Sequence, residues 1–263
     1  MTLKKENMML NKVFCTLFLV PLLLVGCGEE KKENAGSKPK LSMVTSADYP
    51  PFEFFITEGS SAKIAGLDMD IAHRVAEYLG YEIETKDVDF TTVIPLVQSG
   101  QADFAMAGIT PTQDREKDLS FSQPYYFMNN VMIHRIDNDF IRRGDYKGVR
   151  IIVQLGSLHE QYAKIWQQQN PGSTVLTLNK LGDAVQELLA GRADGIICDE
   201  TPSKSYISKY SQELTMQNLE GESFGLAIAF KKGSPLVIDF NRALDHLNEI
   251  GALDEIINKW LAQ

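Results

Sequence analysis

The chain of 263 residues is long enough to form one large domain or two lobes of ordinary size. Its 44% hydrophobic and 23% charged residues are typical of a globular protein and exclude a collagen-like or disordered chain. A formal net charge of −9 excludes the broad basic surface that nucleic-acid binding requires, so no nucleic-acid partner is expected.

The N-terminus has the features of an export signal. Three lysines within the first twelve residues precede an apolar run over residues 13–25, which is too short to span a bilayer. The run ends in Leu24-Val25-Gly26-Cys27, which resembles the lipobox of bacterial lipoproteins. This predicts a signal peptide over residues 1–26, lipidation of Cys27 and a charged flexible tether over residues 27–40. An ordinary signal peptide that happens to contain a cysteine is the alternative.

Cysteine and histidine usage indicates neither disulfides nor a metal site. Cys15 and Cys27 belong to the predicted leader, which leaves Cys198 alone in the mature body and allows no disulfide within it. The histidines show no metal-ligand spacing, so we expect no metal or cofactor and interpret them as solvated surface residues. They are His73, His134, His159 and His246.

Strand and helix signals alternate from Leu41 onward. Strands are predicted over residues 41–45, 82–88, 102–107, 129–134, 149–153, 174–178, 194–198, 214–219 and 225–230. Helices are predicted from about Asp68 to Gly80 and over residues 91–99, 158–169, 182–190, 202–210, 235–250 and 252–261, with a loop over residues 136–148. The alternation predicts α/β layers around mostly parallel sheets.

One stretch, residues 102–126, carries the clearest chemical signal. The strand breaks at Gly108, a polar turn with Thr110 follows, and Arg115 stands in a short charged helix. Outward-pointing backbone N–H groups beside a planar guanidinium suit a small carboxylate. An exposed loop with one surface arginine is the alternative.

Several motifs occur in one order along the chain. They are Tyr49-Pro50-Pro51-Phe52-Glu53-Phe54, Gly66-Leu67-Asp68-Met69-Asp70-Ile71-Ala72, Ile94-Pro95-Leu96 with Ser99-Gly100, the Thr110–Arg115 turn, Phe121-Ser122-Gln123-Pro124-Tyr125-Tyr126, Gly156-Ser157, and Gly191-Arg192-Ala193-Asp194 with Asp199. With them the chain resembles the solute-binding proteins of bacterial ABC importers for polar amino acids, and most of all the arginine-binding members.

The resemblance implies the type II periplasmic-binding fold. Two α/β lobes would be joined by two crossing strands, with a ligand cleft between them. The first lobe would comprise residues 41–128 and 224–263, and the second lobe residues 129–223.

The resemblance also implies a site for the backbone of an amino acid. Arg115 matches the arginine that takes the carboxylate, and the backbone N–H and hydroxyl of Thr110 would add to that anion site. The carbonyl of Gly108 would accept a hydrogen bond from the ammonium, which Asp199 would pair with. The alternative for Asp199 is a helix N-cap before Thr201-Pro202.

Further ligand contacts follow from the resemblance. Tyr49 and Phe90 match an aromatic pair that sandwiches the ligand side chain. Ser157 and the backbone N–H of Leu158 match groups of the second lobe that complete carboxylate binding. The family often has a hydroxyl residue where Leu158 stands, so only backbone donation carries over.

Four polar residues flank the expected position of the ligand side chain. They are Ser46, Asp48, Glu53 and Gln154. Lysine- and glutamine-binding relatives often have aspartate where Ser46 stands, so that acid is missing here. Arginine or another polar amino acid is the predicted ligand.

The resulting hypothesis is a non-catalytic binding lipoprotein. It would act as a monomer in the periplasm or at the cell surface, held to a bacterial membrane through its lipid anchor. It would capture one L-amino acid and deliver it to an ABC transporter permease.

Three alternatives belong to other classes. Gly221-Glu222-Ser223-Phe224-Gly225, with His246 downstream, matches the nucleophile elbow of hydrolases, but that motif needs a following helix and a strand is predicted. A cyclohexadienyl dehydratase shares the fold, but its relatives carry glutamate where Asp199 stands. A sensor domain would continue into a transmembrane helix and further domains, whereas the sequence ends at Gln263.

Overall fold

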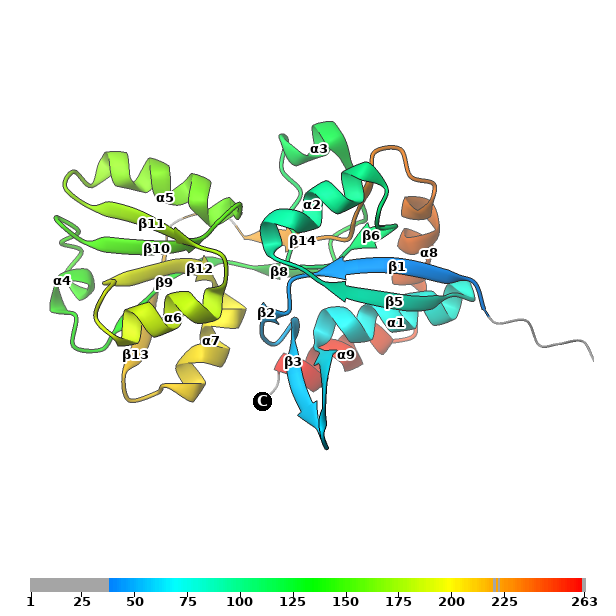
Figure 1. Cartoon of the computed structure of the whole chain (residues 1–263), viewed down its shortest axis with the longest axis horizontal. Coiled ribbons are helices and arrows are strands. Elements are labelled where there is room, and N and C mark those ends of the chain that lie inside the picture. The colour runs from blue at the N-terminus through cyan, green and yellow to red at the C-terminus, as the bar shows by residue number, and fades with distance from the viewer. Residues whose placement is uncertain (1–37, 220, 222, 262–263) are drawn as a thin grey trace, which may run out of the picture. The chain divides into compact units, whose positions relative to one another are not determined.

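The computed structural model describes residues 38–219, 221 and 223–261 (Figure 1). The predicted signal peptide, Cys27 and most of the predicted tether lie outside the described residues. Within the described part of the chain, no helix is both long and apolar enough to cross a membrane.

The first sheet is mixed rather than mostly parallel. Its strands are β1 (Lys40–Thr45), β5 (Glu82–Asp87), β6 (Phe104–Ala105), β7 (Leu119–Phe121) and β15 (Ala229–Lys231). In the sheet order β5-β1-β6-β15-β7, β1 pairs parallel with β5 and β6, while β15 is antiparallel to both of its neighbours. The predicted parallel order fails where the chain returns to this sheet as β15, after the whole second sheet has been completed.

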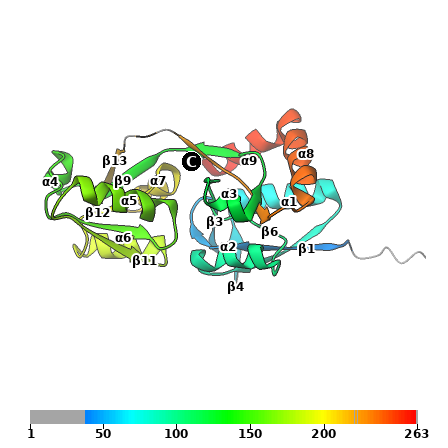
Figure 2. The same cartoon turned by 90° about the horizontal axis from the view of Figure 1, so that it is seen from above.

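Helices cover both faces of this sheet. They are α1 (Leu67–Leu79), α2 (Phe90–Ser99), α8 (Leu236–Glu249) and α9 (Ala252–Leu261). Successive strand residues point to opposite faces, so Met43 packs with α1, α8 and α9 while Val44 packs with α2. Figure 2 shows α1, α8 and α9 gathered along one side. Trp260 ties α9 to α1, because its Nε1 donates to Asp70 Oδ2 at 2.7 Å. This sheet and these helices, with the loops and short elements that join them, are called the first lobe below.

A second mixed sheet follows the same plan. Its strands are β9 (Asn130–Arg135), β10 (Arg150–Gln154), β11 (Thr174–Leu178), β12 (Gly195–Asp199) and β13 (Leu214–Asn218). In the order β11-β10-β12-β9-β13, β10 is parallel to β11 and β12, and β9 is antiparallel to β12 and β13.

Four helices accompany this sheet. They are α4 (Asp139–Arg142), α5 (Leu158–Gln169), α6 (Leu181–Leu189) and α7 (Glu200–Lys209). Ile151 packs with Trp166 of α5 on one face, and Ile152 packs with Val185 of α6 on the other. Of the four, only the short α4 was not predicted, and it falls in the expected loop. This sheet and these helices are called the second lobe.

Two short antiparallel strands connect the lobes. They are β8 (Tyr126–Met128) and β14 (Phe224–Leu226). The strand predicted over residues 225–230 is therefore wrong as one element: β14 pairs with β8, and β15 joins the first sheet after Ala227 and Ile228. The predicted lobe boundaries next to β8 and β14 stay predictions.

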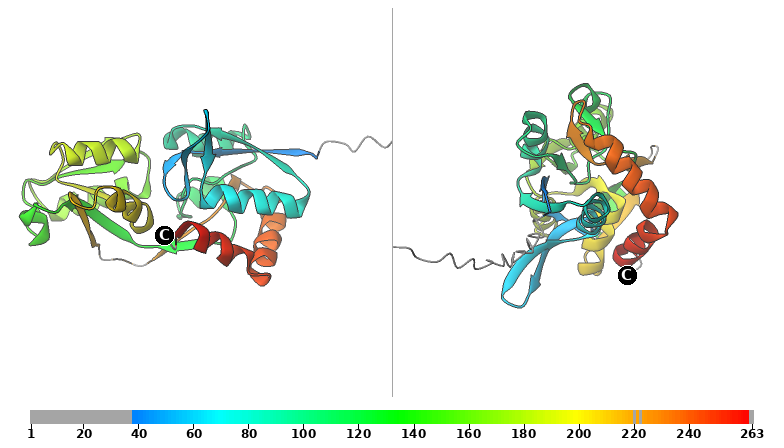
Figure 3. Two further views of the ribbon diagram at one scale, coloured as in Figure 1. Left: turned by 90° about the horizontal axis from the view of Figure 1, so that it is seen from below. Right: turned by 90° about the vertical axis from the view of Figure 1, so that its right-hand side faces the viewer.

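A three-stranded sheet of the first lobe escaped prediction. It consists of β2 (Asp48–Tyr49), β3 (Glu53–Glu58) and β4 (Ser61–Ala65) in the order β2-β3-β4. Figure 3 shows the β3–β4 hairpin projecting from the first lobe. The hairpin is largely exposed and lacks a clear apolar alternation, which is why the pattern did not reveal it. Its partner β2 carries Asp48 and Tyr49 toward the candidate site.

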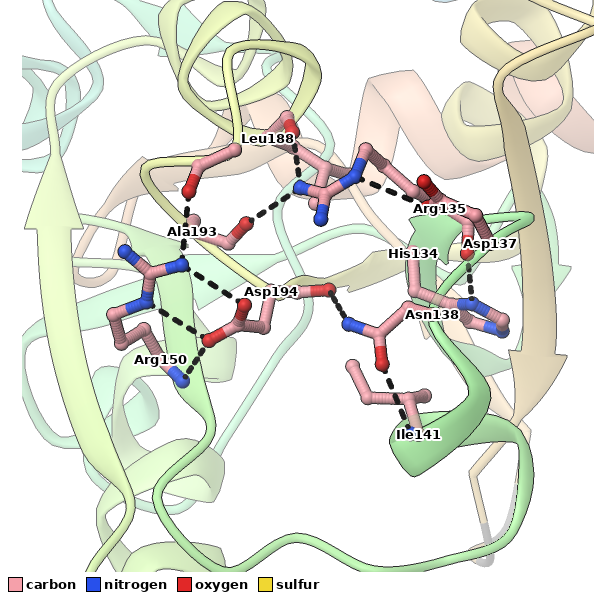
Figure 4. A network of polar contacts seen from close by, with 10 residues as sticks. His134, Arg135, Asp137, Asn138, Ile141, Arg150, Leu188, Ala193 and Asp194 are labelled. Carbon is pink, nitrogen blue, oxygen red and sulfur yellow. Dashed lines mark hydrogen bonds and ion pairs between the residues drawn. The ribbon is translucent and has the colours of Figure 1, made fainter.

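The Gly191–Asp194 motif serves the second lobe itself. Asp194 takes a bidentate pair from Arg150, with Nε–Oδ2 and Nη2–Oδ1 distances of 2.9 Å (Figure 4). Arg150 also donates to the carbonyl of Gly191 at 2.9 Å, and Arg135 donates to the carbonyl of Ala193 at 3.3 Å. The motif therefore fixes the turn before β12, whose last residue is Asp199.

Candidate functional site

One cavity with about 420 Å³ of empty space takes residues from both lobes. Its lining consists of Ser46, Asp48, Tyr49, Glu53, Phe90, Ala107, Gly108, Thr110, Arg115, Gln154, Ser157, Leu158, His159, Asp199 and Phe224. Every ligand-binding residue predicted from the sequence is in this set.

The topology explains why these residues meet. Phe90 follows β5, Gly108 follows β6, Gln154 ends β10 and Asp199 ends β12. Carboxyl ends of parallel strands meet at one edge of a sheet, and sites of open α/β sheets lie there. The second sheet presents the same kind of edge, so its residues complete the cavity.

Arg115 is held in place by backbone carbonyls at the start of α3 (Arg115–Asp118). Its Nη1 donates to the carbonyl of Thr110 at 3.0 Å, and its Nη2 donates across the lobes to the carbonyl of Gly156 at 3.4 Å. The guanidinium carbon lies 5.9 Å from the ring centroid of Phe90. Burial lowers the pKa of Arg115 to about 10, so the group stays charged at neutral pH. Its burial and its place in the lining of the cavity make the interpretation as an exposed surface arginine a poor fit.

The N-terminus of α5 adds positive potential beside Arg115. Ser157 is the N-cap; its Oγ accepts from the N–H of Glu160 at 3.3 Å and donates to the carbonyl of Gln154 at 2.7 Å. The first N–H groups of a helix, here including that of Leu158, have no partner within the helix and attract anions. The hydroxyl of Ser157 is thus engaged in capping, and the backbone of α5 remains for an anion.

Gly156 permits the close approach of the two lobes at this point. Its φ of +77° is in the left-handed region, and a Cβ there would lie 3.2 Å from Cγ2 of Thr91 in the first lobe. A larger residue would therefore move α5 away from Arg115.

Asp199 supplies the opposite charge and is only 3% exposed. It occupies the N-cap position of α7, yet its side chain makes no capping hydrogen bond. Its Oδ1 instead lies 3.0 Å from Nε2 of His159. The N-cap alternative thus describes the position of Asp199 in the chain but not the role of its carboxylate. Burial raises the pKa of Asp199 well above its ordinary value.

The interpretation of all four histidines as solvated surface residues is wrong. His134 is 2% exposed and His159 is 8% exposed. Burial, and then the charge of Arg115, lower the pKa of His159 to about 4, so the ring is neutral at neutral pH. A neutral ring that carries its proton on Nε2 donates to Asp199.

Tyr49 and Phe90 are buried and line the cavity. Gly108 brings the backbone against Tyr49: its φ is +58°, and a Cβ there would lie 2.8 Å from Cε1 of the tyrosine. Only glycine fits this turn against the tyrosine ring.

A buried acidic cluster forms one end of the cavity. Glu53 is 1% exposed and lines the cavity, next to Asp68, which accepts a hydrogen bond from the hydroxyl of Tyr125 at 2.9 Å. Glu53 Oε2 and Asp68 Oδ1 have no donor among the described residues. Burial, and then the charge of Asp68, raise the pKa of Glu53, and burial raises the pKa of Asp68 to about 6. Two adjacent carboxyls of this kind share a proton unless a cation is present.

The other polar residues at this end are tied to one another. Ser46 Oγ donates to Asp48 Oδ1 at 3.0 Å, and Gln154 Nε2 lies 3.4 Å from Asp48 Oδ2 and 3.1 Å from the carbonyl of Asn179. Asp48 therefore reaches the cavity with both carboxylate oxygens already bound to the protein.

Four lining residues were absent from the predicted binding set: Glu53, Ala107, His159 and Phe224. Glu53 was expected only to flank the side-chain end, although its pairing opposite Tyr49 in the β2–β3 ladder places both at the cavity. His159 lies next to Leu158 in the first turn of α5, so its nearness to predicted residues was a usable signal. Within the described residues, no cluster of three or more His, Cys, Asp or Glu side chains is placed to hold a metal ion.

The sequence model of the bacterial extracellular solute-binding proteins, family 3, matches residues 41–263. The chain belongs to this family. A similar family member is the arginine-binding extracellular protein ArtP of Bacillus subtilis, 35% identical over 92% of this chain and 93% of that protein. A probable histidine-binding protein of Campylobacter jejuni is 29% identical over 95% of this chain and 98% of its own length.

Solved structures of related proteins have the same fold. An ancestral arginine-binding protein bound to arginine has a TM-score of 0.79 and 33% identity, covering 86% of this chain and 99% of that one. An ancestral amino acid-binding protein described as a precursor of cyclohexadienyl dehydratase has a TM-score of 0.75 and 31% identity. The match covers 84% of this chain and 95% of that one. The chain is thus an amino acid-binding member of the family with the type II periplasmic-binding fold, as the motifs predicted.

The hydrolase elbow lacks its required context. Ser223 is followed by β14 rather than by a helix, and its Oγ lies 2.6 Å from Oδ1 of Asn129. The ring of His246 stacks on Tyr78 with centroids 4.6 Å apart.

Proposed function

We propose that this protein captures L-arginine, or a closely related polar amino acid, outside the cytoplasmic membrane and delivers it to an ABC permease. A lipid on Cys27 would hold it to the membrane. The choice of ligand rests on Glu53. Its buried carboxylate has an oxygen without a hydrogen-bond donor among the described residues, and it lines a cavity that also holds Arg115 and Asp199.

The ligand backbone matches one half of the cavity. Its carboxylate would take the fork of Arg115, the N–H of Leu158 and the backbone N–H and hydroxyl of Thr110. Its ammonium would pair with Asp199 and donate to the carbonyl of Gly108. Because both ionic pairs would be buried together, removing one partner of either pair would cost roughly 2–5 kcal/mol of binding free energy.

The ligand side chain matches the other half. Tyr49 and Phe90 would flank its aliphatic stem, and a guanidinium would reach Glu53, with Ser46 and Gln154 beside it. A guanidinium would replace the proton that Glu53 and Asp68 otherwise share and would give the unpartnered oxygen a donor. A ligand with a cationic side chain therefore gains more binding free energy at this end of the cavity than a ligand with a neutral amide. The cation-binding acid that is missing at Ser46 would be supplied by Glu53.

A dehydratase on the same fold is the second candidate, favoured by the related precursor of cyclohexadienyl dehydratase. Against it stands the contact between Asp199 and His159, because an oxygen that accepts a hydrogen bond is held as an acceptor. An acceptor suits an ammonium better than it suits protonation of a leaving group. We therefore favour a binding protein that performs no chemistry on its ligand.

A screen of the twenty amino acids by thermal shift, followed by calorimetry, tests the proposed function. We expect arginine to give the largest shift. Arogenate and prephenate are incubated in parallel and followed for turnover. A lack of any shift, or turnover of either compound, would overturn the proposal.

Fractionation of bacterial cells tests the membrane anchor separately. Wild-type protein should incorporate labelled palmitate and sediment with membranes, whereas Cys27→Ala should do neither and still bind the ligand. Equal membrane association of the two proteins would exclude anchoring through Cys27.

A further inference from the structure

Asp48 lines the cavity, but its polar atoms are bound to the protein itself. Its Oδ2 accepts from the backbone N–H of Leu181 at 2.8 Å and lies 3.4 Å from Nε2 of Gln154. Its backbone carbonyl accepts from the hydroxyl of Tyr206 at 3.3 Å, and its Oδ1 accepts from Ser46. Asp48 belongs to β2 of the first lobe, whereas Leu181, Gln154 and Tyr206 belong to the second.

The contact with Leu181 completes the start of a helix. Leu181 is the first residue of α6, and its N–H has no partner within the helix. The N-cap residue Lys180 makes no side-chain capping bond. A carboxylate at this position satisfies the N–H and the helix dipole, as an N-cap side chain does, but here it comes from the other lobe.

Two hydrogen-bond donors and one positive charge surround the carboxylate of Asp48 at this junction. Burial raises the pKa of Asp48, while the hydrogen bonds from Leu181 and Ser46 and the charge of Lys180 act against that rise. Gly182, the next residue of α6, lies beside Tyr206: a Cβ there would be 3.4 Å from the tyrosine hydroxyl. Three elements of the second lobe thus converge on one residue of the first.

We propose that Asp48 is a closure latch: it caps α6 of the second lobe from the first lobe, and it stabilises the closed cavity without selecting the ligand. The proposal rests on the proposed capture of an amino acid between the lobes. When the lobes separate, Leu181 must lose its donor contact to Asp48, because the two residues belong to different lobes. The latch therefore makes the free energy of closing more favourable, by the same amount for every ligand.

A latch and a ligand contact have different signatures. Residues that touch the ligand side chain, as proposed for Glu53, change the relative affinities of different amino acids. Loss of the latch lowers the affinity for every amino acid by one common factor. That factor is about tenfold to a hundredfold for a hydrogen bond to a charged group. The loss appears in the dissociation rate, because capture begins with the open form.

Three variants test the proposal. Asp48→Ala removes the cap, whereas Asp48→Asn keeps an oxygen that accepts from Leu181. Asp183→Asn is the matched control, because it removes an exposed acid from the first turn of the same helix. Affinity and dissociation rate are measured with L-arginine, L-histidine and L-glutamine, and hydrogen exchange of the Leu181 amide is followed by NMR.

The latch predicts an equal loss of affinity in Asp48→Ala for every amino acid that the wild type binds, together with faster exchange at Leu181. Asp48→Asn should retain most of the affinity and most of the protection of the Leu181 amide. Asp183→Asn should resemble wild type. Selective loss for one ligand, or unchanged exchange at Leu181, would overturn the latch. If the wild type binds no amino acid, the proposed function fails and the latch fails with it. If the wild type binds an amino acid but Asp48→Ala loses affinity selectively, or leaves Leu181 exchange in the liganded protein unchanged, only the latch fails.

Discussion

His159 Nε2 lies 3.0 Å from Asp199 Oδ1, and both side chains are buried. This contact holds one oxygen of the carboxylate and leaves the other for the cavity. Because Arg115 helps to keep the ring neutral, His159 acts as a donor and adds no second positive charge next to the ligand ammonium. It is a positioning residue for Asp199.

Removal of this donor should weaken ligand binding. We expect His159→Leu to lower arginine affinity roughly tenfold, since a buried carboxylate loses a hydrogen bond. His159→Gln, which retains an amide donor, should recover most of the loss. Calorimetry with the three proteins checks the prediction, and equal affinities for wild type and His159→Leu would contradict it.

Arg115→Lys should be close to inactive in binding, although it preserves the charge. A compact ammonium cannot reproduce the planar fork toward the carboxylate. We expect a loss of about 2–5 kcal/mol in binding free energy, with the melting temperature nearly unchanged. Lys117→Ala on the same short helix is the control, because Lys117 is exposed and pairs with Asp114. Wild-type affinity in Arg115→Lys would remove Arg115 from the site.

Glu53→Gln should change selectivity rather than abolish binding. Loss of the carboxylate charge should weaken arginine roughly tenfold to a hundredfold and affect glutamine much less. Removing one of two adjacent buried acids should leave the free energy of unfolding equal or higher, which urea denaturation measures. Equal loss for both ligands would argue against a contact between Glu53 and the ligand side chain.

Acidification should stabilise the wild type relative to Asp68→Asn. The pKa of Asp68 is about 6 in the folded protein and 3.8 ordinarily, so between these values the folded state binds a proton that the unfolded state does not. The wild type therefore gains up to roughly 3 kcal/mol relative to the variant as the pH falls from above 6 toward 4. The contribution of His159, which has the opposite sign, is present in both proteins and cancels. Parallel curves of unfolding free energy against pH would contradict the raised pKa.

Asp194→Ala should reduce stability and spare the site. It leaves Arg150 without its bidentate partner and removes the acceptor for the N–H of Arg150, which lies 2.8 Å away (Figure 4). We expect a loss of about 1–3 kcal/mol, and each kcal/mol lowers the melting temperature by about 2–4 °C. Arginine affinity at 25 °C should stay near that of the wild type. A large loss of affinity with unchanged melting would assign Asp194 to the site instead.

For two elements with strong local signals, both the first and the last residue were predicted correctly. Helix α5 runs over Leu158–Gln169 as expected, because Ser157 caps its start and Pro171-Gly172 follows its end. Strand β11 has the predicted bounds Thr174–Leu178. Strand β6, in contrast, shrinks to Phe104–Ala105, because its pairing with β1 and β15 covers only two residues.

The strand predicted over residues 225–230 shows the limit of local pattern. Its residues are apolar throughout, but hydrogen-bonding partners in two different sheets divide it into β14 and β15. Pairing partners lie far away in the sequence, so periodicity cannot reveal such a division.

The sequence by itself determined the family, the alternation of strands and helices, and most of the residues that line the cavity, among them Arg115 and Asp199. These features depend on local patterns and on motifs that keep their order along the chain. Only the tertiary structure showed that His159 holds Asp199, that Glu53 lies buried beside Asp68, and that Asp48 caps α6. Each of these depends on side chains that are distant in sequence or on the burial of a polar group, and burial is a property of the packed lobes rather than of any segment.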